Sequence, residues 1–259
     1  MELRDFAQTV LLGSDLQAKL AAPAEPLTDE HPGPPLRPLA PGRPADLQIV
    51  PAPKAPVPSL QGMADPNQRR RILHALANHE LQAAELYAWA LLAFPDAGAE
   101  FRRDLLAVLL DEQRHTRMYA ARLEANGARL GDFPVSGYFW HKAPYLSTPL
   151  RFVCAMALTF ENANLDHTVD YAEAARRAGD TKTAAVIDRV HQDEVEHVRL
   201  GWKWLQAWKG GASAWEVFNA QLTWPLHPSR ARGRRFHPHG REAAGLDPEF
   251  IRLLEESGP

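Results

Sequence analysis

Residues 111–115 read DEQRH and residues 193–197 read DEVEH, so the pattern Asp-Glu-x-x-His occurs twice in the chain. Random order in a chain of this composition would give about 0.04 such matches, so two occurrences are a pattern rather than chance. In an α-helix the Glu and the His of each motif lie about 60° apart and can bind one metal ion from the same face. The two motifs therefore predict two metal-binding helices.

Both motifs interrupt apolar helical stripes. Along the helix predicted at 99–126, Leu105 precedes Glu112 and His115 on one face, and the helix predicted at 180–209 repeats this arrangement. A carboxylate in an apolar core is costly unless it is paired or bound to a metal ion. The positions of these side chains therefore favour a bound cation.

Capping residues, glycines and prolines predict four long helices, at 66–94, 99–126, 149–179 and 180–209. About twenty residues connect the second helix to the third, which is typical of the crossover in a ferritin-like four-helix bundle. We therefore predict an all-α fold of this type, organised as an N-terminal helix and Pro-rich strap at 1–64, the bundle at 65–210 and a C-terminal helical tail at 211–259.

A two-metal bundle needs one further glutamate from each of the other two helices. Glu161 is the candidate in the third helix, whereas the first helix offers Glu80 and Glu85, which lie about 140° apart around the axis. Glu80 lies on the apolar stripe and precedes Glu112 by 32 positions, close to the 33 that separate Glu161 from Glu194. We therefore predict Glu80 as the ligand.

The predicted metal ligands are Glu80, Glu112, His115, Glu161, Glu194 and His197. Four glutamates balance two divalent ions, and carboxylates with one imidazole per ion suit two iron ions, with manganese or a mixed manganese–iron pair as the alternative. Around the ligands we predict hydrogen bonding by Asp111, Asp193 and His191, and a pocket lined by Tyr87 and Tyr119.

Four segments carry a family resemblance: NHELQAAELY at 78–87, GDFPVSGYFW at 131–140, FENANLDH at 160–167 and DEVEHVRLGWKWL at 193–205. The order of glutamates and histidines resembles the ferritin-like di-iron carboxylate superfamily, and the first segment is similar to the first-helix motif of the demethoxyubiquinone hydroxylases. Over residues 40–255 the chain most closely resembles the family catalogued as domain of unknown function 455. The third-helix motif of that family reads Glu-Ala-Arg-Gly-Leu-Asp, whereas this chain has ENANLD and lacks the arginine.

The resemblance implies an oxidoreductase in which two iron ions activate O2 to hydroxylate or desaturate a small organic substrate, with an electron donor. Two alternatives stay open. One is a ferroxidase or other iron-handling protein, and the other is a non-catalytic, metal-stabilised helical module that binds a partner or RNA.

The composition restricts partners and location. A net charge of −3 argues against a general nucleic-acid surface. The dense basic run of Arg230, Arg232, Arg234 and Arg235 is interpreted as a solvated loop, with binding of a phosphate-bearing substrate, RNA or a partner protein as the alternative. No apolar stretch is long enough to span a membrane, and the start of the chain is unlike a secretory signal. The single cysteine, Cys154, has apolar neighbours and is predicted to be a buried structural thiol. We expect a cytoplasmic monomer or small homo-oligomer.

Overall fold

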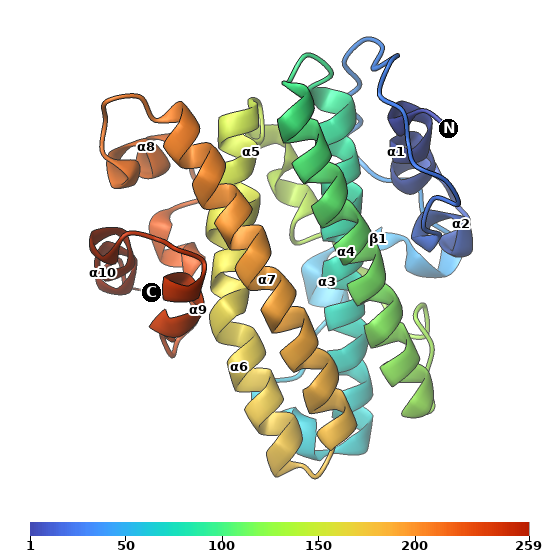
Figure 1. Ribbon diagram of the computed structural model, residues 1–259. Coiled ribbons are helices and arrows are strands. Elements are labelled where there is room, and N and C mark those ends of the chain that lie inside the picture. Colours follow the sequence, from blue (N-terminus) through green and yellow to red (C-terminus); the bar gives the residue numbers. More distant parts are fainter. Residues whose placement is uncertain (259) are drawn as a thin grey trace. The chain divides into compact units, whose positions relative to one another are not determined.

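Helices make up most of the computed structural model, which describes residues 1–258 and confirms the predicted all-α class (Figure 1). The chain divides into two units, the first ending at Pro144 and the second beginning at Tyr145. Each unit contains one long helical hairpin. Within residues 1–258, no helix has the length and apolar character that crossing a membrane requires.

The hairpin of the first unit consists of α3 (Pro66–Ala93) and α4 (Ala99–Ala125), which lie side by side in Figure 1. The Asp65 carboxylate caps α3 by accepting hydrogen bonds from two backbone amides of its first turn. After α4, Gly127 has a φ of 81°, the left-handed conformation that ends a helix at little cost. Both helix ends agree with the sequence prediction.

The N-terminal segment lies along α3. It contains α1 (Leu3–Leu12), α2 (Leu16–Leu20), η1 (Ala45–Leu47), β1 (Ile49–Val50), η2 (Ala52–Lys54) and η3 (Leu60–Ala64). The Leu36 amide donates to the Leu92 carbonyl at 2.9 Å, and the Trp89 indole donates to the Pro38 carbonyl at 3.1 Å. The Pro-rich tract therefore packs along the helix as an ordered strap. This covering explains why α3 is buried on more than one side.

The connection after α4 contains β2 (Val135–Ser136) and η4 (Trp140–Tyr145). β2 pairs in parallel with β1, with Ile49 opposite Val135, so the connection is also joined to the strap. The sequence does not predict this short ladder, because two residues per strand leave no detectable periodicity.

His74 fixes the start of this connection and makes the first unit sensitive to acid. Its buried Nε2 accepts a hydrogen bond from the Gly131 amide at 3.0 Å, and burial lowers its pKa from 6.5 to about 4. The unfolded chain therefore binds a proton first, so the stability from neutral His74 is complete above pH 6.5 and is lost as the pH falls toward 4. We expect the protonation of His74 to lower the free energy of unfolding by up to about 3 kcal/mol over that range.

Urea unfolding of the metal-free wild type and of His74→Gln, each at pH 7 and pH 5, measures this effect. Glutamine can accept the same hydrogen bond but does not titrate, so the wild type should lose more stability between the two pH values than the variant. Equal losses would show that His74 is not the acid-sensitive group.

The hairpin of the second unit consists of α5 (Pro149–Ala155), η5 (Met156–Glu161) and α6 (Asn162–Arg177), followed by the antiparallel α7 (Thr181–Trp208). The sequence predicts an uninterrupted helix over 149–179, but η5 is a π-helix. The wider turn packs against Gly201 of α7, where an added Cβ would lie 2.5 Å from the Ala157 Cβ. A glycine at this position thus makes room for the π-turn.

The C-terminal tail consists of α8 (Ala214–Gln221), η6 (Pro228–Ala231), α9 (Pro238–Ala243) and α10 (Pro248–Glu256). Phe250 of α10 packs edge-on against Trp202 of α7, with ring centroids 5.0 Å apart, so this tryptophan has a packing role. Arg241 is fully buried and pairs with Asp166 of α6 at 2.8 Å. The tail is therefore anchored to the second hairpin.

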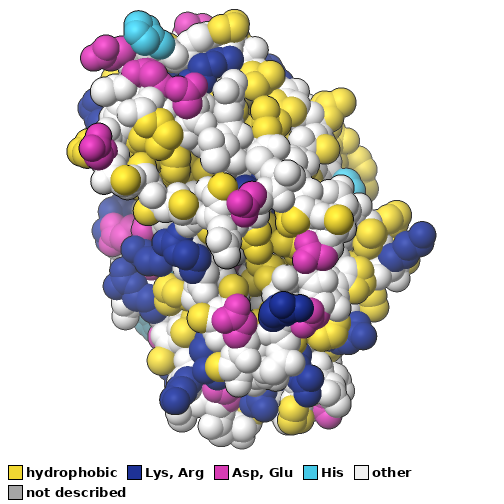
Figure 2. Space-filling view, turned by 90° about the vertical axis from the view of Figure 1, so that its right-hand side faces the viewer, with side chains coloured by type: hydrophobic (Ala, Val, Ile, Leu, Met, Phe, Trp, Pro, Cys, Tyr) yellow, Lys and Arg dark blue, Asp and Glu magenta, His cyan; other side chains and the backbone are white. Residues whose placement is uncertain are grey.

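Figure 2 shows the side of the molecule that carries α1 and α2 in Figure 1. Basic and acidic side chains are interspersed on this face, with hydrophobic side chains between them. This mixed surface agrees with the small net charge of −3.

Candidate metal centre

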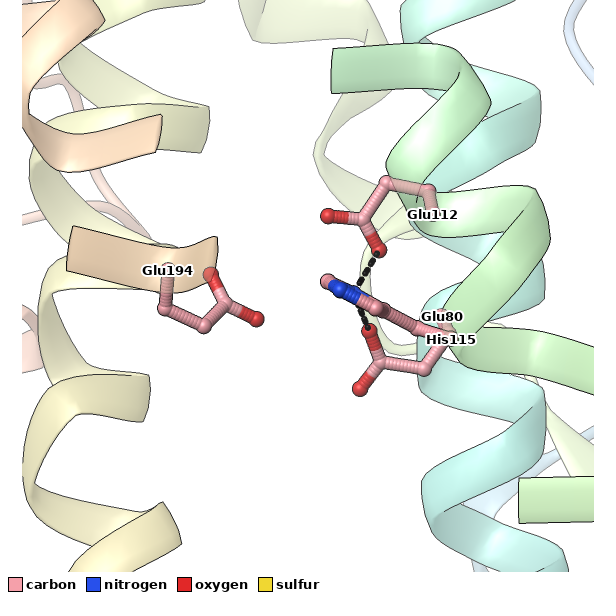
Figure 3. Close-up of side chains that lie close together, drawn as sticks. All are labelled: Glu80, Glu112, His115 and Glu194. Atoms are coloured by element: carbon pink, nitrogen blue, oxygen red, sulfur yellow. Dashed lines mark ion pairs between the residues drawn. The ribbon is translucent and has the colours of Figure 1, made fainter. Parts of the chain in front are cut away.

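The first hairpin brings together Glu80 of α3 with Glu112 and His115 of α4. The His115 Nδ1 atom lies 3.3 Å from a Glu80 carboxylate oxygen and 3.7 Å from a Glu112 carboxylate oxygen. Figure 3 shows the imidazole ring between the two carboxylates. All three residues are buried, with exposed fractions of at most 4%.

The second hairpin repeats this arrangement with Glu161 at the end of η5 and with Glu194 and His197 of α7. The His197 Nδ1 atom lies 3.6 Å from Glu194 Oε2, nearly the same separation as between His115 and Glu112. Ligand atoms of the three residues lie within 4.8 Å of one another, and all three residues are buried. Each unit thus contains one Glu-Glu-His cluster of predicted ligands.

The π-turn positions Glu161 at its last residue. In a π-helix the backbone bonds skip one residue more than in an α-helix, so the turn is wider and a side chain is rotated from its α-helical direction. The Thr159 hydroxyl donates to the Cys154 carbonyl at 2.7 Å and stabilises the widened turn. Cys154 is buried as predicted, and burial raises the pKa of its thiol to about 12.

Polar residues of α6 and α7 surround the second cluster. The Asn164 amide donates to Glu194 Oε1 at 2.7 Å. The Thr168 hydroxyl donates to the Asn164 carbonyl at 2.7 Å and lies 2.8 Å from His191 Nδ1. Because the only hydroxyl proton of Thr168 is used, His191 Nδ1 must carry a proton and donate to this oxygen. Burial lowers the pKa of His191, which favours the neutral form of the ring over the charged one.

Asp111 and Asp193 are both engaged by arginines of their own helices. The Asp111 carboxylate pairs with Arg114 at 2.8 Å, and Asp193 pairs with Arg189 at 2.8 Å. Their predicted role of orienting the imidazole of the opposite motif would join the two units, and it stays a prediction.

The two tyrosines predicted to line a pocket are both buried. Tyr87 lies about two turns after Glu80 on α3, and Tyr119 lies about one turn after His115 on α4. Their helical positions agree with the predicted stripes, whereas a role toward a substrate stays a prediction.

Glu85, the alternative to Glu80, has a different environment. Its fully buried carboxylate contacts Lys19 Nζ at 3.2 Å and Arg43 at 2.8 Å and accepts a hydrogen bond from the Trp140 indole at 2.8 Å. Burial lowers the pKa of Lys19, while the Glu85 carboxylate opposes this shift. Glu85 therefore joins the strap and the connection to α3, and Glu80 is the α3 glutamate that lies in the cluster.

The basic loop is partly used for internal contacts. Arg235 pairs with Asp170 and Glu173, and Arg232 donates to the Glu255 carbonyl. Arg230 and Arg234 are exposed, as a solvated loop requires. Arg241, from the same stretch, is buried instead, and no local pattern in the sequence predicts this because its partner Asp166 lies 75 residues away.

The donor atoms of each cluster fit a transition-metal ion. Ligand atoms about 2.1 Å from one first-row metal ion lie about 3 to 4 Å from one another, and the separations of 3.3, 3.6 and 3.7 Å fall in this range. Glu194 Oε2 is buried and accepts no hydrogen bond from any of residues 1–258. Because two buried carboxylates repel each other, a cation would stabilise each cluster.

The fold and the clusters define an all-helical protein with two buried Glu-Glu-His sets that could each hold a metal ion. The chain belongs to the family described as Protein of unknown function (DUF455), which matches residues 4–252 and confirms the family resemblance. An uncharacterised protein of Haemophilus influenzae is 26% identical over 160 residues, which cover 58% of this chain and 56% of the relative. The chain thus matches little more than half of that relative's length. No solved structure matches the chain.

Proposed function

We propose that this chain is a ferritin-like oxidoreductase that uses two iron ions, or a manganese-containing pair, and O2 to oxidise a small organic substrate. The observation that carries the proposal is the repeated cluster: two glutamates and one histidine, buried and in the same chain order, once in each unit. A single two-metal centre formed by all six side chains within a four-helix bundle is part of this proposal.

The charges of the six residues support the proposed metal pair. The four glutamates carry four negative charges, which two divalent ions balance, so the loaded site has no net charge in its apolar surroundings. Carboxylate oxygens with one imidazole nitrogen per ion suit iron and manganese, and the six ligands include no thiolate, which softer ions such as Cu(I) prefer.

The side chains have distinct roles in this proposal. His115 and His197 would bind through Nδ1, because this ring nitrogen faces the carboxylates of the cluster. Burial of all six ligands keeps bulk water from the site. When bound, an iron pair supplies the electron transfer to O2 that the side chains of the protein cannot supply themselves.

Anaerobic loading followed by exposure to air tests the proposal. Protein loaded with Fe(II) is expected to consume O2 and develop ferric absorption, while metal-free protein treated in the same way does neither. Rapid O2 uptake that yields only mineralised iron would favour iron handling instead. Uptake of less than one metal ion per chain, with melting unchanged by a chelator, would favour a non-catalytic helical module.

Anomalous scattering at the iron and manganese edges, from crystals grown without added metal, tests the ligands and the metal identity together. Two peaks, each next to one histidine, are expected. Peaks at other side chains would contradict the ligand assignment.

A further inference from the structure

The two clusters consist of the same residue types, two glutamates and one histidine, but the residues around them differ. Asn164, on the turn after Glu161, donates its amide to Glu194 Oε1 at 2.7 Å. This length is typical of a hydrogen bond to an ionised carboxylate, which is about twice as strong as one between neutral groups. An ionised carboxylate can only accept hydrogen bonds, so the Asn164 atom that contacts it must be the amide nitrogen and not the amide oxygen.

This hydrogen bond assigns different roles to the two oxygens of Glu194. Oε1 is engaged by Asn164, whereas Oε2 lies 3.6 Å from His197 Nδ1. Oε2 accepts no hydrogen bond within residues 1–258. The Asn164 amide therefore orients the carboxylate so that Oε2 and the imidazole nitrogen point to the same place.

The first hairpin carries a different residue at the position that corresponds to Asn164. Glu80 corresponds to Glu161, because these residues precede the motif glutamates by 32 and 33 positions. Three residues after Glu161 stands Asn164, whereas three residues after Glu80 stands Ala83. A methyl group cannot donate a hydrogen bond, so the two hairpins differ at this position whatever else contacts Glu112.

We propose that Asn164 is a positioning residue that fixes Glu194 as a ligand through one oxygen, and that it thereby makes the two metal sites unequal. The inference rests on the proposed function, since it requires that the clusters bind divalent first-row metal ions. Partners that hydrogen-bond to a metal ligand typically change metal affinity by about 10- to 100-fold. Loss of the amide should therefore lower the affinity for one of the two metal ions and leave the affinity for the other unchanged.

Titration with Mn(II), which is stable in air, tests this inference without any measurement of activity. Free Mn(II) is counted by its electron paramagnetic resonance signal as it is added to the metal-free full-length protein. We expect two ions per wild-type chain, and in Asn164→Ala we expect one of the two to bind about tenfold more weakly. The nearly isosteric Asn164→Leu should behave in the same way, because it also lacks the donor.

Asn126→Ala is the matched control. It removes an asparagine side chain that donates to the Arg122 carbonyl at 2.8 Å at the end of α4, about three turns beyond His115, and it should bind both ions as the wild type does. Thermal melting of the metal-free proteins checks the fold: Asn164→Leu leaves a buried carboxylate oxygen without its donor, so it should melt at a somewhat lower temperature than the wild type, but cooperatively and above the temperature of the titration.

Three results would overturn the inference. The first is that Asn164→Ala binds Mn(II) as tightly as the wild type does. The second is that Asn164→Leu restores wild-type binding. The third is that both ions bind equally more weakly and the melting temperature is lowered. A wild type that binds less than one ion would overturn the proposed function as well, so the two failures are distinguishable.

Discussion

Replacing Glu194 with glutamine is expected to remove one of the two metal ions and to slow O2 consumption by about 100-fold or more. An amide has the shape of the carboxylate but no charge, so the second cluster would lose one of its two anionic ligands. The apolar surroundings magnify this loss, because Glu194 is only 1% exposed. Metal analysis and O2 uptake after anaerobic Fe(II) loading measure both effects.

Glu196→Gln is the matched control for this change. Glu196 lies two residues further along α7, but its side chain is 58% exposed and pairs with Arg199. Metal content and O2 uptake should equal those of the wild type. Full metal content in Glu194→Gln would contradict the assignment of Glu194 as a ligand.

Glu85→Gln is expected to lower the free energy of unfolding by about 3 kcal/mol or more without removing a metal ligand. The substitution would leave Lys19 and Arg43 as buried cations next to a neutral group, with side-chain exposures of 0% and 1%. Breaking a buried pair on one side is costly because the remaining charge stays desolvated. Urea unfolding of the metal-free protein measures the change.

Glu124→Gln is the control for Glu85, because Glu124 is an exposed residue of the same unit. The Glu124→Gln substitution should change the free energy of unfolding by less than about 0.5 kcal/mol. Equal free energies of unfolding for Glu85→Gln and Glu124→Gln would show that the Glu85 carboxylate does not stabilise the buried charges of Lys19 and Arg43.

The sequence was informative wherever a local signal determines the structure. Asp65 before Pro66 predicted the start of α3, and Gly127 and Gly179 predicted the ends of α4 and α6. The spacing of glutamates and histidines predicted the membership of both clusters, because side chains three residues apart share a helix face. These features depend on residues close in sequence.

Other features depend on contacts that the sequence does not display. The π-turn at 156–161 differs from an α-helix only in which backbone groups pair, and it leaves no compositional trace. Asn164 was predicted only as part of a helix, because its partner Glu194 lies 30 residues away. Arg241 is completely buried by its pairing with Asp166, and no local pattern predicts this because the two residues lie 75 positions apart.

The surroundings of Glu85 also bear on how sequences of this family can diverge. Lys19, Arg43, Glu85 and Trp140 come from α2, the strap, α3 and η4, and all of them meet at one carboxylate. Contacting residues have coupled energies, so a change at one position alters the cost of a change at the others. We therefore expect these four positions to change together among sequences of the family, so that the N-terminal segment and α3 are inherited as a unit.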